Sequence, residues 1–159
     1  MRRSWYRSAG SAIVMSVWLA VAGCGSVTDD DLHAPDSGTI TFNVESYEVN
    51  LPPGTCVLGD FFPTPFRATV RNSEGDPLND IQVTFRLSTA LTGFVFLNKA
   101  GDIIGLDPVL GISEVVVKSD DDGVAEVVVG VPACVNVADD LTAHSGTAFG
   151  SVHISVEEM

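Results

Sequence analysis

The chain has 159 residues, with 21 acidic against 8 basic side chains, which gives a net charge of −13. Such an acidic chain is not expected to bind nucleic acid or an anionic membrane surface, because both require positive charge on the protein. Its length is sufficient for one domain with a hydrophobic core.

Residues 1–23 have the three parts of a secretory signal peptide. Arg2, Arg3 and Arg7 make the start basic, and the apolar run 12–22 follows. A transmembrane helix needs about 20 apolar residues, so this run is too short to span a bilayer. We therefore expect the segment to be removed on export.

Cys24 stands directly behind this segment. Residues 21–24 read Val-Ala-Gly-Cys and resemble the bacterial lipobox. The resemblance implies that Cys24 becomes the mature N-terminus and carries acyl chains on its sulfur and amine, which together hold a protein permanently at a membrane. Gly25, in place of aspartate, further implies the outer membrane if the bacterium is Gram-negative. The alternative is an ordinary secretory signal with an incidental cysteine.

Residues 24–38 are predicted to be a lipidated start followed by a flexible acidic tether. From residue 25 they read GSVTDDDLHAPDSG, with small, acidic and turn-forming residues and no apolar period. We expect the acidic run 29–31 to be solvated spacer, and the alternative is a site for a partner.

From residue 39 onward, apolar and polar residues alternate as they do in β-strands. The alternating or β-branched segments are 39–51, 66–71, 81–88, 94–97, 114–118, 124–129, 141–144 and 152–156. Turn signals separate them at intervals of roughly ten residues. The pattern predicts an all-β fold over residues 39–159, an antiparallel β-sandwich in a single domain.

Three segments carry a family resemblance. Residues 66–85, FRATVRNSEGDPLNDIQVTF, are similar to the bacterial Ig-like domain of the invasin and intimin type, where a strand passes through an Asn-Gly-x-Pro turn into the next strand. Residues 119–129 resemble that family's Thr-Asp-x-x-Gly-x-Ala hairpin, and residues 141–156 resemble its closing strand. The resemblance implies an Ig-like sandwich. It indicates fold rather than function, because the matching positions are turn and core residues.

Two loops depart from the family pattern, and long loops of this kind are often functional. The loops are residues 51–65 and 98–113. They hold five apolar side chains that are candidates for binding a partner: Phe61, Phe62, Ile103, Ile104 and Leu106. The interpretation that we favour is that these side chains cap the open end of the sandwich.

With Cys24 lipidated, Cys56 and Cys134 remain and predict a disulfide bond in an oxidising compartment. Both cysteines lie at the same end of the sandwich only if residues 89–112 make no crossing or form a complete hairpin. A single strand there would separate them beyond disulfide reach. We predict the hairpin, with residues 94–97 as one arm. Free thiols, or a metal pair with a histidine, are the alternatives.

No motif for catalysis, metal or cofactor binding is found. The histidines are His33, His144 and His153, and none has a metal-ligand spacing such as HExxH. The run DDDG at 120–123 does not fit an EF-hand, because Lys118 and Val129 would occupy positions that need carboxylates. We expect a solvated turn there, with a looser calcium site as the alternative.

The sequence therefore predicts a lipid-anchored module of the bacterial cell envelope with a non-catalytic interaction, adhesion or structural role. Its partner would be a protein or a glycan, and it would contact the membrane through its N-terminal lipid. One alternative is a surface carbohydrate-binding or adhesive module, which would show exposed aromatic rings in a planar row. The other is an enzyme, which would need a pocket with convergent titratable groups.

Overall fold

The computed structural model describes residues 32–51, 61–87, 93–107, 112–133 and 135–158. The predicted signal peptide and the three cysteines, Cys24, Cys56 and Cys134, lie outside these ranges. Within the ranges, no helix has the length and apolar character needed to cross a membrane.

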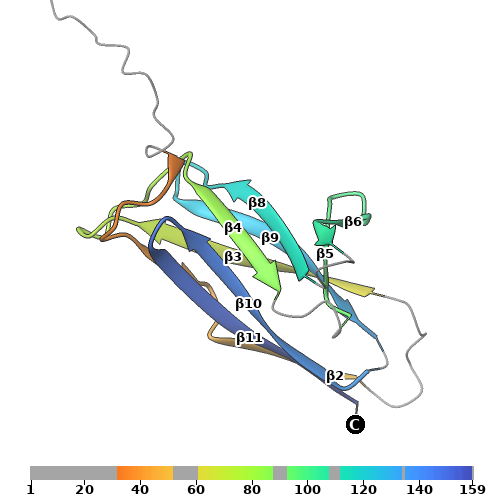
Figure 1. Cartoon of the computed structure of the whole chain (residues 1–159). Coiled ribbons are helices and arrows are strands. Elements are labelled where there is room, and N and C mark those ends of the chain that lie inside the picture. Colours follow the sequence, from red (N-terminus) through yellow and green to blue (C-terminus); the bar gives the residue numbers. More distant parts are fainter. Residues whose placement is uncertain (1–31, 52–60, 88–92, 108–111, 134, 159) are drawn as a thin grey trace, which may run out of the picture.

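The first sheet, sheet A, has five strands in the order β1-β3-β9-β5-β6 (Figure 1). Their bounds are β1 Thr39–Phe42, β3 Phe61–Arg71, β9 Val124–Pro132, β5 Val95–Leu97 and β6 Ile103–Ile104. All of its pairs are antiparallel. Its longest ladder joins β3 to β9, from Phe61 opposite Pro132 to Thr69 opposite Val124.

The second sheet, sheet B, has six strands in the order β2-β11-β10-β4-β8-β7. Their bounds are β2 Ser46–Leu51, β11 Ala148–Glu158, β10 Val137–Ser145, β4 Gln82–Leu87, β8 Ile112–Lys118 and β7 Leu106–Asp107. Four of the pairs are antiparallel, but β2 runs parallel to β11. The expected antiparallel sandwich is thus correct except at this edge. There the chain leaves β1 in sheet A and enters sheet B alongside β11.

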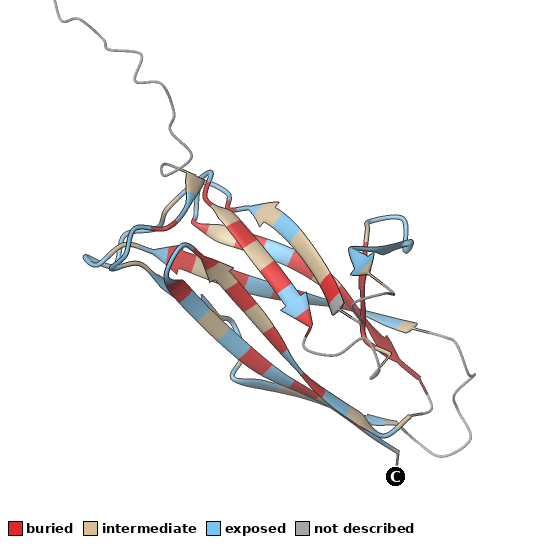
Figure 2. Ribbon diagram, in the orientation of Figure 1, coloured by how far each residue is buried: buried red, intermediate tan, exposed pale blue. Residues whose placement is uncertain are grey.

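The two sheets pack face to face, and buried and exposed residues alternate along their strands (Figure 2). Phenylalanines contributed by both sheets fill the core, with Phe66 1% exposed and Phe85 0% exposed. Phe42 meets Phe85 edge to face at 6.2 Å, and Tyr47 meets Phe66 in the same way at 5.5 Å. The predicted all-β sandwich is confirmed.

Residues 32–38 pack against the sandwich, although the sequence places them in the tether. Ala34 is 5% exposed and belongs to the core, and its N–H donates a hydrogen bond to Ser145 Oγ at 2.8 Å. Gly146 has a φ of +57°, and a Cβ there would lie 2.7 Å from the carbonyl oxygen of Ala34. The folded domain therefore begins before residue 39.

Both predicted loops contain strand residues. β3 begins at Phe61, inside the expected loop 51–65, and β6, β7 and the start of β8 lie within 98–113. The predicted hairpin with 94–97 as one arm is confirmed, because Phe96 pairs with Ile104 and Leu97 with Ile103 in antiparallel orientation. The chain then crosses from sheet A to sheet B at Gly105, whose carbonyl oxygen accepts the N–H of Glu114 at 2.7 Å.

This crossing requires glycine at position 105. Gly105 has a φ of +66°, and a Cβ there would overlap the carbonyl oxygen of Glu114. We expect Gly105→Ala to cost on the order of 2 kcal/mol of unfolding free energy, through backbone strain and displacement of β7. Urea denaturation measures this cost.

Gly101→Ala is the matched control, because Gly101 also has a positive φ, +89°, but a Cβ there would meet nothing within 4 Å. Equal losses in the two variants would contradict the role of the close approach to Glu114.

Candidate functional site

The structure places the five candidate partner-binding residues in one half of the sandwich, toward the end where Phe61 stands opposite Pro132, which we call the open end. Four of them are well exposed in the following fractions: Phe62 44%, Ile103 48%, Ile104 38% and Leu106 42%. Phe61 is half-buried. The opposite end, which we call the turn end, holds the turns 72–80, 119–123 and 146–147 and the entry of the chain at Ala34.

The five side chains do not share one surface. Residues directly opposite each other in paired strands point to the same face of a sheet. Phe62 pairs with the core residue Val131, and Ile104 pairs with the core residue Phe96, so both lie on the core side. Leu106 pairs with the buried Ser113 in the same manner. These three side chains lie on the core side, as the capping interpretation expects of all five, whereas Phe61 and Ile103 point outward.

Outward-facing positions toward the open end of sheet A are apolar on four neighbouring strands, and Pro63, Pro65 and Ile103 among them are open to solvent. One row crosses four strands through Pro65, Val128, Leu97 and Ile103. Pro63, Val95, Phe61 and Pro132 continue it toward the open end. We call these eight residues the apolar half-face, and none of them carries a charge. Contiguous apolar surface of this kind marks interaction sites on soluble proteins.

Gly130 lies within the apolar half-face and lets its neighbours pack closely. A Cβ on Gly130 would lie 3.0 Å from Val95 Cγ2 and 3.1 Å from Leu97 Cδ1, so both side chains lean over the glycine. Val95 is 7% exposed and Leu97 is 8% exposed. The centre of the surface is close-packed, whereas Pro63, Pro65 and Ile103 at its margins are open to solvent.

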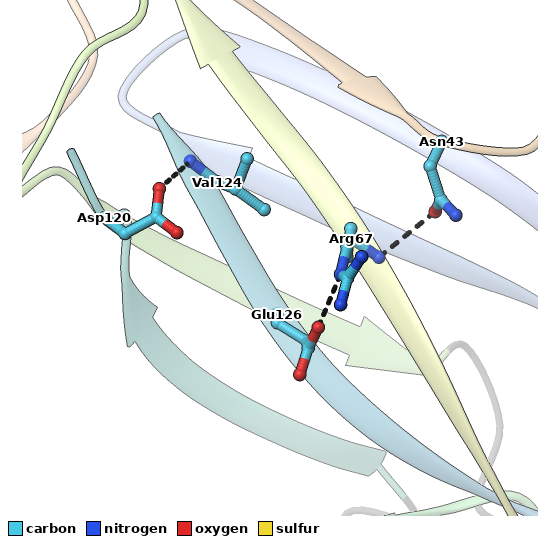
Figure 3. A network of polar contacts seen from close by, with 5 residues as sticks. All are labelled: Asn43, Arg67, Asp120, Val124 and Glu126. Atoms are coloured by element: carbon cyan, nitrogen blue, oxygen red, sulfur yellow. Dashed lines mark hydrogen bonds and ion pairs between the residues drawn. The ribbon is translucent and has the colours of Figure 1, made fainter. Parts of the chain in front are cut away.

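The other half of the outer face of sheet A is polar (Figure 3). Arg67 Nε pairs with Glu126 Oε2 at 2.5 Å, and the Arg67 N–H donates to Asn43 Oδ1 at 3.2 Å. The Asp120 carboxylate accepts the N–H of Val124 at 2.8 Å, which organises the acidic turn. Sheet A therefore changes from charged to apolar along its own length.

Two prolines block the unpaired backbone edge at the start of β3. β1 pairs with β3 only from Ala68 to Arg71, so the start of β3 has no second partner strand among the described residues. Pro63 and Pro65 have no N–H to offer to an added strand. Because the edge is blunted in this way, a partner must recognise the side chains of the apolar half-face rather than its backbone.

A groove of about 300 Å³ lies beside the apolar half-face, between β8 and β9. Sequence reasoning missed it, although the run Val115–Val117 is an unusually apolar strand for an edge position. We call it the edge groove. Its lining is Phe96, Leu97, Asn98, Lys99, Ile104, Val115, Val116, Val117, Glu126, Val127 and Val128.

A more polar pocket of about 670 Å³ lies at the turn end and brings together His33 and His144, with Asp36 and Thr84 also in its lining. His153 lies elsewhere, on the outer face of sheet B, where its Nδ1 is 2.7 Å from Asp140 Oδ1. In the described part of the chain, no group of three or more His, Cys, Asp or Glu side chains is placed to hold a metal ion.

No family model matches the sequence, and no curated protein matches it. Among solved structures, the adhesin InvE of Yersinia pseudotuberculosis is similar, with a TM-score of 0.44, 12% identity, and coverage of 80% of this chain and 28% of the adhesin. The C-terminal domain of ZirS has a TM-score of 0.43 and 11% identity, covering 99% of this chain and 86% of that domain. PapD-like domain 7 of human CEP192 has a TM-score of 0.40 and 12% identity, covering 97% and 98%. The likeness is one of fold, and the chain spans less than a third of the adhesin.

Proposed function

We propose that the protein is a non-catalytic interaction module that binds a protein partner through the apolar half-face of sheet A. The observation that carries the proposal is that the outward-facing positions of four neighbouring strands are uncharged and apolar, with Pro65 and Ile103 open to solvent, in a chain whose net charge is −13. Depletion of charge at a close-packed apolar centre, with polar residues around it, is the composition found at the core of protein interfaces.

We further propose that the module is held at the bacterial cell envelope by lipid on Cys24, at the outer membrane if the bacterium is Gram-negative. Ala34 enters the domain at the turn end, whereas the apolar half-face lies at the open end. β3 joins the two ends with 11 residues, or roughly 35 Å of strand. An anchor at the N-terminus would therefore leave the apolar half-face directed away from the membrane.

A protein partner suits this surface better than a glycan. Among the described residues, the phenylalanines with well-exposed rings are Phe62, 44% exposed, and Phe149, 61% exposed. They lie in different sheets, so they do not form the planar row of rings that a carbohydrate platform would present.

Photo-crosslinking in the native envelope tests the proposal. A photoreactive amino acid at position 103, within the apolar half-face, is expected to give a discrete adduct of higher mass. Position 149 is the matched control, because Phe149 is also an exposed apolar residue but lies on sheet B. Absence of an adduct at position 103, or the same adduct at both positions, would contradict the proposal.

A further inference from the structure

The edge groove forms where two consecutive strands separate. β8 and β9 are joined by a tight turn in which the N–H of Asp120 donates to the carbonyl oxygen of Val124 at 3.0 Å. Beyond this turn β8 continues in sheet B and β9 in sheet A. The sandwich is therefore open along this side, with an apolar floor that includes Phe96, Ile104 and Val127.

Backbone groups of β8 point toward the groove. Glu114 donates its N–H away from β4, to the carbonyl oxygen of Gly105, whereas Ser119 donates its N–H toward β4, to the carbonyl oxygen of Ile81 just before that strand. Since backbone groups alternate sides along a strand, Val116 and Lys118 direct their N–H and C=O groups to the same side as Glu114. β7 pairs with β8 only at Ile112 and Ser113, so within the described ranges no strand satisfies this part of the edge.

The stretch of β8 around Val116, which has no partner strand among the described residues, is bounded at both ends. Gly105 already lies opposite Glu114, and Val124 is already bonded to Asp120. An extended chain running through the groove would meet Gly105 at one end and the turn at the other. The last few residues of a polypeptide can instead enter from one side, and they then meet only Gly105 or only the turn.

Lys99 supplies a positive charge beside this apolar floor. Residues 32–158 contain five basic side chains, and three of them form ion pairs: Arg67 with Glu126, Arg86 with Glu114 and Lys118 with Asp80. Arg71 donates to the carbonyl oxygen of Gly75. Lys99 has neither kind of contact in the described part of the chain, and Glu126, the carboxylate that lines the groove, is neutralised by Arg67.

We propose that the edge groove binds the C-terminal residues of a partner polypeptide. The last side chain of the partner is apolar and occupies the groove, its backbone bonds to the free edge of β8 at Val116, and its terminal carboxylate pairs with Lys99. Strand addition and capture of a terminal carboxylate are both established modes of peptide recognition. The inference rests on the proposed protein-binding function and names the part of the partner that is recognised.

Peptide binding to the full chain tests the inference. The probes are N-terminally fluorescent tetrapeptides that end in each apolar residue, prepared as free acids and as C-terminal amides, with anisotropy as the readout. At least one acid is expected to bind about tenfold more tightly than its amide, as a charge-assisted contact would produce. Lys99→Gln should abolish this difference.

Lys118→Gln is the matched control, because Lys118 is an exposed lysine that is not part of the groove lining and lies 3.8 Å from Asp80. It should leave the preference for the acid intact. The inference is overturned if, up to millimolar peptide, no free acid binds more tightly than its amide. It is also overturned if Lys118→Gln removes the preference for the acid as Lys99→Gln does. If the adduct at position 103 forms nonetheless, the proposed function stands and only the groove assignment fails.

Discussion

Phe85→Ala is expected to lower the free energy of unfolding by about 3–5 kcal/mol, a large share of the 5–15 kcal/mol typical of a domain. Phe85 is 0% exposed and lies on β4, between β10 and β8 near the middle of sheet B. Its ring packs edge to face on Phe42 at 6.2 Å, so truncation removes a contact between the two sheets as well as buried volume. Urea denaturation followed by circular dichroism measures the loss.

The matched control for this variant is Phe149→Ala. Phe149 is 61% exposed on the outer face of the same sheet, so the same chemical change should alter stability by less than about 0.5 kcal/mol. A cost at position 149 equal to that at position 85 would show that the assigned inner and outer faces of sheet B are wrong.

Removal of the predicted disulfide between Cys56 and Cys134 is expected to cost about 4 kcal/mol, because the bond would close a loop of roughly 80 residues in the unfolded chain. The cysteines lie outside the described residues, and the pairing remains a prediction. It is supported by the ladder of β3 and β9, in which Phe61 stands opposite Pro132. Cys56 precedes the first of these residues closely in sequence, and Cys134 follows the second.

Three serine variants test this pairing. If the bond exists, Cys56→Ser, Cys134→Ser and the double variant should lose the same stability, because each one removes the same cross-link. A reductant should destabilise the unsubstituted protein and leave the double variant unchanged. Additive losses, or a natural chain indifferent to reductant, would contradict the bond. The intact mass of the protein from its native membrane, expected to match residues 24–159 plus lipid, tests the anchor at Cys24 in the same preparation.

Most strands could be predicted from the alternation of their residues. The pattern at 81–88 corresponds to β4 at Gln82–Leu87, and the pattern at 124–129 corresponds to the first part of β9. Local sequence carries this information because one face of each strand is buried. Residues 61–65 escaped prediction because Pro63 and Pro65 ordinarily argue against a strand. They are tolerated here because β1 does not pair with this part of β3.

Other features depended on contacts between distant segments. Ala34 belongs to a stretch without any apolar period, and it is buried only because the turn after β10 receives it. The parallel pairing of β2 with β11 likewise depends on which sheet the chain enters after β1. In sequence, the stretch around Ala34 looks like a tether, and β2 looks like an ordinary edge strand.

By itself, the sequence determined an all-β sandwich, the hairpin at 94–97 and the five apolar side chains at the open end, because two-residue periodicity and loop composition are local properties. Only the tertiary structure decided which face each of these side chains occupies, since register sets that choice, and a shift of one residue reverses it. The apolar half-face joins Pro65, Leu97, Ile103 and Val128 through strand order, and the edge groove exists because β8 and β9 enter different sheets. Both surfaces depend on which strands lie side by side in the folded protein, and no local pattern in the sequence encodes that arrangement.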